Sequence, residues 1–438
     1  MTTLIFPLSR IEGHAQVVIE LEGGKVVSAR FQAMEMRGFQ FLVQGAPAEQ
    51  MPVIAPRVCG VCSTAHHVAA VKALEDAWAV TPPPIALRIR ELLMLGQLIQ
   101  NQATSLFVFT MPDRLGVSSL FQLASEDLGS TEHRAELARR ALLVRRAGTD
   151  LITTAGGQFI HPIKAVVGGV SSGIGAAEAQ SAREQIARSL PVACELVNAY
   201  WTMTMALHDR IGTWGDDAPS RYIAAVADSR PNYCADRFRV TDLDGELCDS
   251  FPPSRLREYL CYEDSDYSYA GRTSYQGDIL RANSLARVNM ASRMGTARAD
   301  EYLGRFREAF GRPAHGILLF DLARAIELVY ALERAGEILT EPLADEPTAV
   351  AHTPRDGEGY GLVEAPRGPL VHRYRIEGGR IAEAEFIIPT VHNVLAIERA
   401  LRVAANRHVT AEHVNLELDR AVGRVVRAFD PCIACATH

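Results

Sequence analysis

The spacing of apolar and polar residues differs between the two ends of the chain and its middle. Near each end, apolar residues alternate with polar ones on both sides of a Gly-Gly turn, at residues 22–25 and again at 377–380. Alternation with a period of two is typical of half-buried strands, and a short glycine turn joins such strands into a hairpin. We therefore predict one small β-hairpin over about residues 14–36 and a second over about 370–390.

Much of the remaining chain has apolar residues three and four positions apart, which is the period of a helix with one buried face. The segments with this pattern are residues 85–109, 132–154, 176–209, 315–335, 393–406 and 411–429. Residues 213–280 differ, because they are rich in Asp, Ser, Tyr and Pro and favour a surface excursion.

No repeat, linker or low-complexity segment divides the chain. We therefore predict a single mainly α-helical domain with small β-hairpin units (α+β) over residues 1–438. Its helical core spans about 85–210 and 315–335, and its C-terminal helices and tail span 393–438.

Composition supports a globular protein and excludes several classes. Apolar residues make up 48% of the 438 residues and charged residues 22%, which is enough for a large core. The net charge of −7 comes from intermixed charges without a basic tract, so we expect no nucleic-acid partner. The chain has no run of about 18 apolar residues, so we expect no membrane-spanning helix. The N-terminus also lacks the pattern of a signal peptide, which favours a cytoplasmic location.

Four of the eight cysteines form two Cys-x-x-Cys pairs near opposite ends of the chain. The pairs are Cys59 with Cys62 and Cys432 with Cys435. Two such pairs can make a four-thiolate site, which suits Zn, Ni, Cu(I) or iron–sulfur chemistry. The pairs can share a metal only if both chain ends meet inside the fold. We expect the other four cysteines, Cys194, Cys234, Cys248 and Cys261, to be small buried hydrophobic residues.

A structural zinc site is the simplest alternative for four thiolates. Zinc pairs usually lie close together in sequence, however, and a chain with this much core needs no zinc for stability. Polar neighbours also flank the pairs: Arg57 and His66 at the first, Asp430 and His438 at the second. A redox dithiol is less favoured, because no thioredoxin-like βαβ pattern surrounds either pair.

Taken together, the motifs of this chain resemble those of nickel–iron hydrogenase large subunits, most closely the cytoplasmic bidirectional enzymes. The matching segments are residues 57–66 and 430–438, and also 10–14, 36–39, 156–162, 285–289, 364–368 and 388–390. Each short motif is weak by itself, but their shared order with all four cysteines is specific. Respiratory quinone-reductase subunits of the same fold lack these cysteines, whereas a hydrogen-sensing regulatory protein is a further alternative.

The resemblance implies a metal ligand set. Cys59 and Cys432 would bind nickel terminally, and Cys62 and Cys435 would bridge nickel to an iron carrying CO and cyanide. Thr390 and the backbone near Pro366 would donate hydrogen bonds to those small ligands.

The resemblance also implies heterolytic cleavage of H2. The proton would pass from the Cys432 thiolate to Glu12, whose pKa an apolar surrounding would raise. Arg367 would hold a positive charge over the open face of the metals, and Asp430 would hold Arg367 in place. His66 would donate a hydrogen bond to a bridging sulfur.

A magnesium-type ion and protein partners complete the implied set. The ion would bind Gln40, the carbonyl of Phe386 and His438, although relatives usually carry Glu at the position of Gln40. Electrons would leave through a small subunit that carries iron–sulfur clusters. They would then reach a further module of the NAD(P), deazaflavin or heterodisulfide-reductase type.

Overall fold

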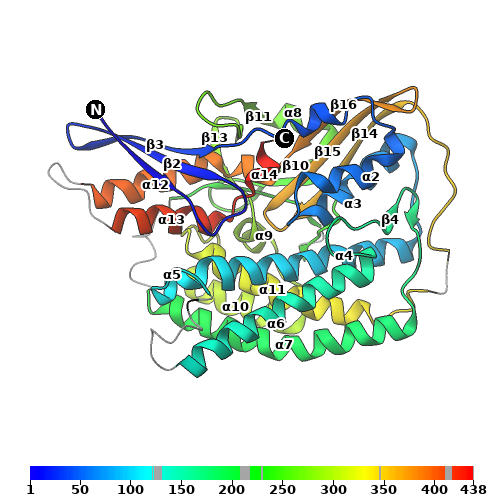
Figure 1. Cartoon of the computed structure of the whole chain (residues 1–438), viewed down its shortest axis with the longest axis horizontal. Helices are drawn as coiled ribbons and strands as arrows, with labels where there is room; N and C mark the ends of the chain where they lie inside the picture. The colour runs from blue at the N-terminus through cyan, green and yellow to red at the C-terminus, as the bar shows by residue number, and fades with distance from the viewer. Residues whose placement is uncertain are drawn as a thin grey trace.

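The computed structural model describes residues 1–120, 122, 131–207, 218–227, 230–344, 347–409 and 417–437. Figure 1 shows long helices gathered on one side and β-sheets with shorter helices on the other. This mixture confirms the predicted α+β class. No described helix combines the length and the apolar character that crossing a membrane requires.

Five long helices make up the helical layer of the molecule, in which they pack against one another as a bundle. They are α4 (Pro84–Ala103), α6 (Thr131–Gly156), α7 (Ala176–Met205), α10 (Ala297–Phe310) and α11 (Leu319–Ile338). Glycine permits the close approach of α4 and α6, because a Cβ at Gly148 would lie 2.4 Å from the backbone nitrogen of Gln100. The predicted helices in this layer are confirmed with shifted ends, except that residues 208–209 lie outside the described residues. The first of them continues from α4 through a π-helical segment (Thr104–Thr110) into α5 (Met111–Leu115).

The C-terminal helices are α12 (Val394–His408) and α13 (Glu417–Phe429), which pack against each other. Both were predicted, although residues 411–416 lie outside the described part of the chain. Shorter elements connect the layers: α1 (Phe39–Leu42), α2 (Met51–Ile54), α8 (Leu256–Tyr259), α9 (Ser284–Met290), α14 (Ile433–Ala436), β4 (Ala165–Val166), β5 (Gly169–Val170), β7 (Val226–Ala227) and β8 (Arg230–Pro231).

Both predicted hairpins form, and each carries a third strand. The N-terminal sheet joins β1 (Thr2–Pro7) to the hairpin of β2 (Ala15–Glu22) and β3 (Lys25–Ala33). The late sheet joins β14 (Gly357–Ala365) to β15 (Gly368–Glu377) and β16 (Arg380–Ile387). Strand β14 was not predicted, because glycine occupies three of its positions and glycine is unfavourable in strands.

The prediction that residues 213–280 form a surface excursion was wrong. This region contributes a six-stranded sheet in the order β10-β9-β6-β13-β12-β11. The strands are β6 (Arg221–Ala224), β9 (Phe238–Thr241), β10 (Leu247–Phe251), β11 (Leu260–Glu263), β12 (Arg272–Tyr275) and β13 (Asp278–Arg281). Phe238, Phe251 and Leu280 are fully buried in a second core cluster. Strands of four or five residues are too short for their alternation to stand out among polar loops.

Helix α3 (Ser63–Trp78), which was not predicted, lies directly on the late sheet. A Cβ at Gly359 would lie 2.1 Å from the carbonyl oxygen of Ala73, and one at Gly361 would lie 2.0 Å from that of Ala69. Only glycine therefore allows the helix backbone to contact β14. This contact fixes the N-terminus of α3, where Cys62 is the N-cap residue.

The two ends of the chain share one core. A continuous cluster of buried apolar residues reaches from Ala15 in β2 to Ala436 in α14. The backbone nitrogen of Ile433 donates to the carbonyl oxygen of Glu12 at 3.2 Å, and that of Arg37 donates to the carbonyl oxygen of Thr437 at 2.7 Å. The described C-terminal tail is therefore buried, as a shared cysteine site requires.

Candidate metal centre

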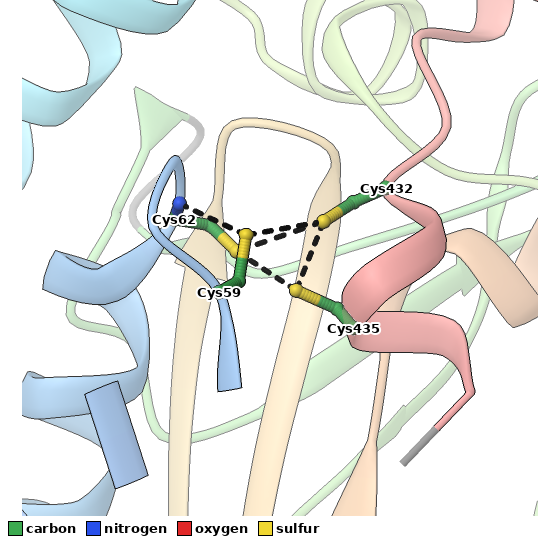
Figure 2. A group of neighbouring side chains, drawn as sticks. All are labelled: Cys59, Cys62, Cys432 and Cys435. Atoms are coloured by element: carbon green, nitrogen blue, oxygen red, sulfur yellow. Dashed lines mark hydrogen bonds between the residues drawn. The ribbon is translucent and has the colours of Figure 1, made fainter. Parts of the chain in front are cut away.

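The two Cys-x-x-Cys pairs meet in the interior. The Sγ atoms of Cys62 and Cys435 are 2.8 Å apart, those of Cys432 and Cys435 2.9 Å, and those of Cys59 and Cys432 3.5 Å. All four sulfur atoms lie within 4.8 Å of one another, and all four residues are buried. Figure 2 shows the sulfurs converging from the loop before α3 and from the C-terminal α14.

Local structure aims each pair inward. Cys59 follows a 3-10 turn (Ala55–Val58) in an extended conformation, and its sulfur accepts a hydrogen bond from the backbone nitrogen of Cys62 at 3.4 Å. At the other end, Asp430 turns the chain after α13 with a φ of 48°, a conformation that Asp tolerates better than most residues. The Nδ2 atom of Asn283 holds this turn by donating to the carbonyl oxygen of Phe429 at 2.9 Å.

Four thiols this close cannot all ionise without a cation. Burial raises the pKa of the Cys62, Cys432 and Cys435 thiols above the ordinary value. Hydrogen bonds from Cys432 and the other two sulfurs lower the pKa of Cys59 well below it. Repulsion and desolvation therefore oppose a second thiolate, and only bound positive charge would offset both. This donor set fits a soft metal centre.

Glu12 contacts the cysteine cluster from a half-buried position. Its Oε2 atom lies 3.2 Å from the Sγ of Cys432 and accepts from the backbone nitrogen of Ala434 at 3.0 Å. Burial raises the pKa of Glu12, and the charge of Cys59 raises it further. The residue as a whole is only half-buried, and its carboxyl group contacts the buried sulfur.

Arg367 is fixed beside the sulfurs by Asp430. Its Nε donates to the carbonyl oxygen of Asp430 at 2.6 Å, and its Nη2 donates to Oδ1 at 3.0 Å. Asn101 holds the other carboxylate oxygen of Asp430 at 3.1 Å. Burial alone would lower the pKa of Arg367, but Asp430 and the cysteines outweigh burial and raise it, so the guanidinium stays charged.

A small cavity adjoins the cysteines. It is lined by Cys62, His66, Ala365, Pro366, Arg367, Leu370, Ile388, Pro389, Thr390, Cys432 and Cys435. Among the described residues, the buried Nη1 of Arg367 has no hydrogen-bond partner. A donor without a partner in an otherwise apolar cavity suits a small ligand that accepts a hydrogen bond. The hydroxyl of Thr390, expected to face such a ligand, accepts from the backbone nitrogen of Cys432 at 3.0 Å.

The remaining predicted site residues divide into three groups. His66 reaches the cluster, with its Nε2 3.4 Å from the Sγ of Cys435. Gln40 and Phe386 line one surface groove together, whereas His438 lies outside the described residues. Arg57 does not reach the site, because its side chain is exposed and donates to the carbonyl oxygen of Val53.

The expectation for the four scattered cysteines was wrong in part. Cys194 is buried and Cys234 is half-buried, whereas Cys248 and Cys261 are exposed. The two exposed cysteines lie on β10 and β11, the outermost strands of the six-stranded sheet.

A buried charge network under the cavity was missed at the sequence level. Arg287 pairs with Glu364 at 2.6 Å and with Glu327, and all three side chains are completely buried. Arg287 also donates to the carbonyl oxygen of Pro366 at 2.8 Å, which fixes the turn that carries Arg367. Burial raises the pKa of Glu364 to about 7. The signal was present as isolated charges within apolar segments, but their pairing depends on three distant elements.

Comparison with known proteins agrees with this geometry. The nickel-dependent hydrogenase family matches residues 37–126 and 231–438, and a HoxL-like family matches residues 2–36. The vhu F420-non-reducing hydrogenase protein of Methanococcus voltae is 32% identical over 409 residues, covering 92% of this chain and 97% of that protein. The NAD-reducing hydrogenase HoxS subunit beta of Cupriavidus necator is 29% identical over 463 residues, covering 99% and 93%.

Solved structures give the same match. An NAD+-reducing nickel–iron hydrogenase in the H2-reduced state superposes with a TM-score of 0.93 at 29% identity, covering 100% of both chains. A nickel–iron–selenium hydrogenase of Dm. baculatum superposes with a TM-score of 0.80 at 21% identity, also over 100% of both chains, which shows a shared fold.

Proposed function

Since this chain belongs to the nickel-dependent hydrogenase family as its large, catalytic subunit, we propose that its four buried cysteines hold the nickel–iron centre that cleaves H2. The observation that carries the proposal is the convergence of four sulfur atoms within 4.8 Å from opposite ends of the chain. The metal pair, when bound, supplies the redox chemistry that turns H2 into two protons and two electrons.

The four cysteines would take different roles at the metal centre. Cys62, Cys432 and Cys435 line the cavity, whereas Cys59 does not, so a metal on the cavity side would lie away from Cys59. Cys62 and Cys435 would hold both metals, and Cys59 and Cys432 would hold nickel, as the resemblance of their motifs implies. The iron's CO and cyanide would occupy the cavity, whose apolar walls exclude water, and Arg367 Nη1 would donate to one of them.

Cys432 and Glu12 form the first step of a proton path. The Cys432 sulfur holds the proton released at the metals and passes it to Oε2 of Glu12 over 3.2 Å. A raised pKa lets this carboxyl group bind the proton near neutral pH and release it outward. Asp430 keeps the positive charge of Arg367 beside the sulfurs, where it stabilises negative charge that develops during cleavage.

Exposed apolar side chains near the metal centre form the docking surface proposed for an iron–sulfur small subunit. They are Met34, Met36, Phe41, Leu42, Val53, Ile160 and Ile163. Hydrogen bonds tie this region to the centre: Arg37 donates to the carbonyl oxygen of Val58, and His161 Nδ1 lies 3.1 Å from that of Pro56. Scattered exposed apolar residues are normal, but seven of them in segments linked to the cysteine loop support an interface here.

A charge placed on the docking surface tests the partner. Leu42→Asp should release the small subunit from the purified complex, because a desolvated carboxylate disfavours an apolar interface. Leu243→Asp is the matched control, since Leu243 is also exposed but lies in the six-stranded sheet region. Equal retention of the small subunit in both variants would contradict this docking surface.

The electron acceptor and the hard-metal site are further parts of the proposal. Relatives named as NAD-reducing and F420-non-reducing hydrogenases support an additional electron-accepting module. We propose a module of the NAD(P), deazaflavin or heterodisulfide-reductase type. The NAD-reducing relative supports the first of these, and the F420-non-reducing relative does not support the deazaflavin type. H2-dependent reduction of each acceptor by the purified complex separates these modules. Such acceptors belong to the cytoplasm, where we place the enzyme, and cell fractionation tests that location. A magnesium ion at Gln40, the Phe386 carbonyl and His438 would appear in metal analysis and disappear in Gln40→Ala.

Metal analysis with infrared spectroscopy tests the centre itself. The purified complex should contain nickel and iron and should show CO and cyanide stretching bands. Cys435→Ser should abolish the bands, whereas Cys194→Ser, which alters a buried cysteine outside the cluster, should retain them. Zinc without nickel, and no bands, would establish a structural zinc site instead.

A further inference from the structure

A line of three buried polar side chains leads away from the cysteine cluster. His66 Nε2 lies 3.4 Å from the Sγ of Cys435, His66 Nδ1 lies 2.9 Å from His372 Nε2, and His372 Nδ1 lies 2.7 Å from the hydroxyl of Tyr374. His66 is 1% exposed, and the other two are completely buried. All three rings lie edge-on or tilted against the ring of Phe386, so their orientation is fixed by packing.

The fold places these groups in line. His372 and Tyr374 are two residues apart on β15, so both point to the same face of the sheet. His66 lies in the first turn of α3, which packs on this sheet because of the glycines in β14.

For neutral imidazoles, these three contacts are satisfied by one arrangement of protons. A metal-bound thiolate can only accept, so His66 must donate from Nε2 to Cys435. The Nδ1 of a neutral His66 then accepts, which requires His372 to donate from Nε2. The Nδ1 of His372 accepts in turn, so the hydroxyl of Tyr374 must donate. A charged imidazole in this buried setting would cost desolvation free energy, which favours the neutral forms.

We propose that His372 and Tyr374 are positioning residues of the metal centre. Tyr374 fixes the tautomer of His372, which fixes that of His66, so that His66 always donates to the Cys435 sulfur. A donated hydrogen bond withdraws electron density from a thiolate and lowers its donation to the metals. His66, His372 and Tyr374, here called the relay, thereby tune the electronic state of the metal centre, although Tyr374 does not contact the cysteines. This inference rests on the proposed function.

Tyr374→Phe tests the relay, because it removes one buried oxygen atom and nothing else. Tyr222→Phe is the matched control, since Tyr222 is also completely buried and its hydroxyl lies 2.8 Å from His315 Nδ1. In the purified complex, Tyr374→Phe should shift the CO and cyanide bands together to lower wavenumber, because a more electron-rich centre donates more into these ligands. The potential of the nickel couple, followed in the same infrared cell, should become more negative. Tyr222→Phe should change neither.

A fluorinated tyrosine at position 374 provides the opposite perturbation without loss of volume. Its more acidic hydroxyl donates a stronger hydrogen bond, so the bands should shift to higher wavenumber. Unmoved bands in the fluorinated protein, or shifts in the same direction for both replacements, would overturn the relay. Absence of nickel and of bands in the unaltered complex would instead overturn the proposed function, so the two failures are distinguishable.

Discussion

Gly13 lies in the loop after β1 and packs against Ile433 and Ala434 of the C-terminal tail that carries Cys432 and Cys435. Replacement of Gly13 by alanine tests this contact. Gly13 has a φ of +79°, and an added Cβ would lie 2.7 Å from the Cβ of Ile433 and 3.2 Å from the backbone nitrogen of Ala434. Non-bonded carbon atoms favour about 3.5–4.0 Å, so the loop must move by about 1 Å.

Two costs add in Gly13→Ala. The left-handed backbone costs alanine about 1–2 kcal/mol, and overpacking costs about 1–3 kcal/mol more. Gly277→Ala isolates the first cost, because Gly277 has a φ of +85° and an added Cβ there would meet nothing within 4 Å. We therefore expect destabilisation of about 2–5 kcal/mol in the first variant and about 1–2 kcal/mol in the second.

The displacement should also separate Glu12 from Cys432, because Glu12 precedes Gly13 and is bonded to the same tail. Thermal unfolding of the two variants measures the stability difference, and isotope exchange between D2 and water measures proton transfer. Gly13→Ala should unfold at the lower temperature and lose most of the exchange, whereas Gly277→Ala should keep it. Equal unfolding temperatures with equal exchange would refute the idea that the loop and the tail are held in close contact.

Three further variants address the proton path, the fixed charge and the buried network. Glu12→Gln should abolish D2–water exchange and leave the infrared bands in place, because an amide cannot carry the proton. Glu398→Gln is the control, since burial also raises the pKa of that carboxyl group, and this variant should retain exchange. Arg367→Lys should lower H2 oxidation about 100-fold at unchanged nickel content, since lysine cannot make both hydrogen bonds to Asp430; activity within twofold of the parent would contradict this role. The pKa of Glu364 is about 7 in the folded protein, whereas the ordinary value is 4.5. The protonated carboxyl group therefore contributes fully to stability below pH 4.5, and this contribution is lost as the pH rises to 7. The free energy of unfolding of Glu364→Gln, measured by thermal unfolding, should therefore rise relative to that of the parent between pH 4.5 and 7, by up to about 3 kcal/mol. Above pH 7 the difference between the two proteins should stay constant. A difference that does not depend on pH would contradict the raised pKa.

Several features could be predicted from the chain alone because they are local. The long helices have an apolar face with helical spacing, and each Gly-Gly turn marks a hairpin. The identity of the candidate ligands is also local, since a Cys-x-x-Cys spacing brings two sulfurs together without help from the fold.

Other features were beyond local patterns. The six-stranded sheet was missed because its short strands gain stability from neighbours distant in sequence, as the parallel pairing of β13 with β6 illustrates. The network of Arg287, Glu327 and Glu364 draws its partners from α9, α11 and β14, so no motif could reveal it. His372 and Tyr374 looked like ordinary strand residues until α3 placed His66 against them.

The sequence by itself determined which side chains could bind metal and which segments form helices and hairpins, because neighbouring residues decide both. Tertiary structure alone decided that Cys59 and Cys432 come within 3.5 Å of each other. Joining the two ends costs chain entropy, and no local signal compensates for that cost. The compensation comes from apolar burial across the whole core, and from glycines such as Gly13 and Gly361 that let backbones touch where the metal ligands must converge.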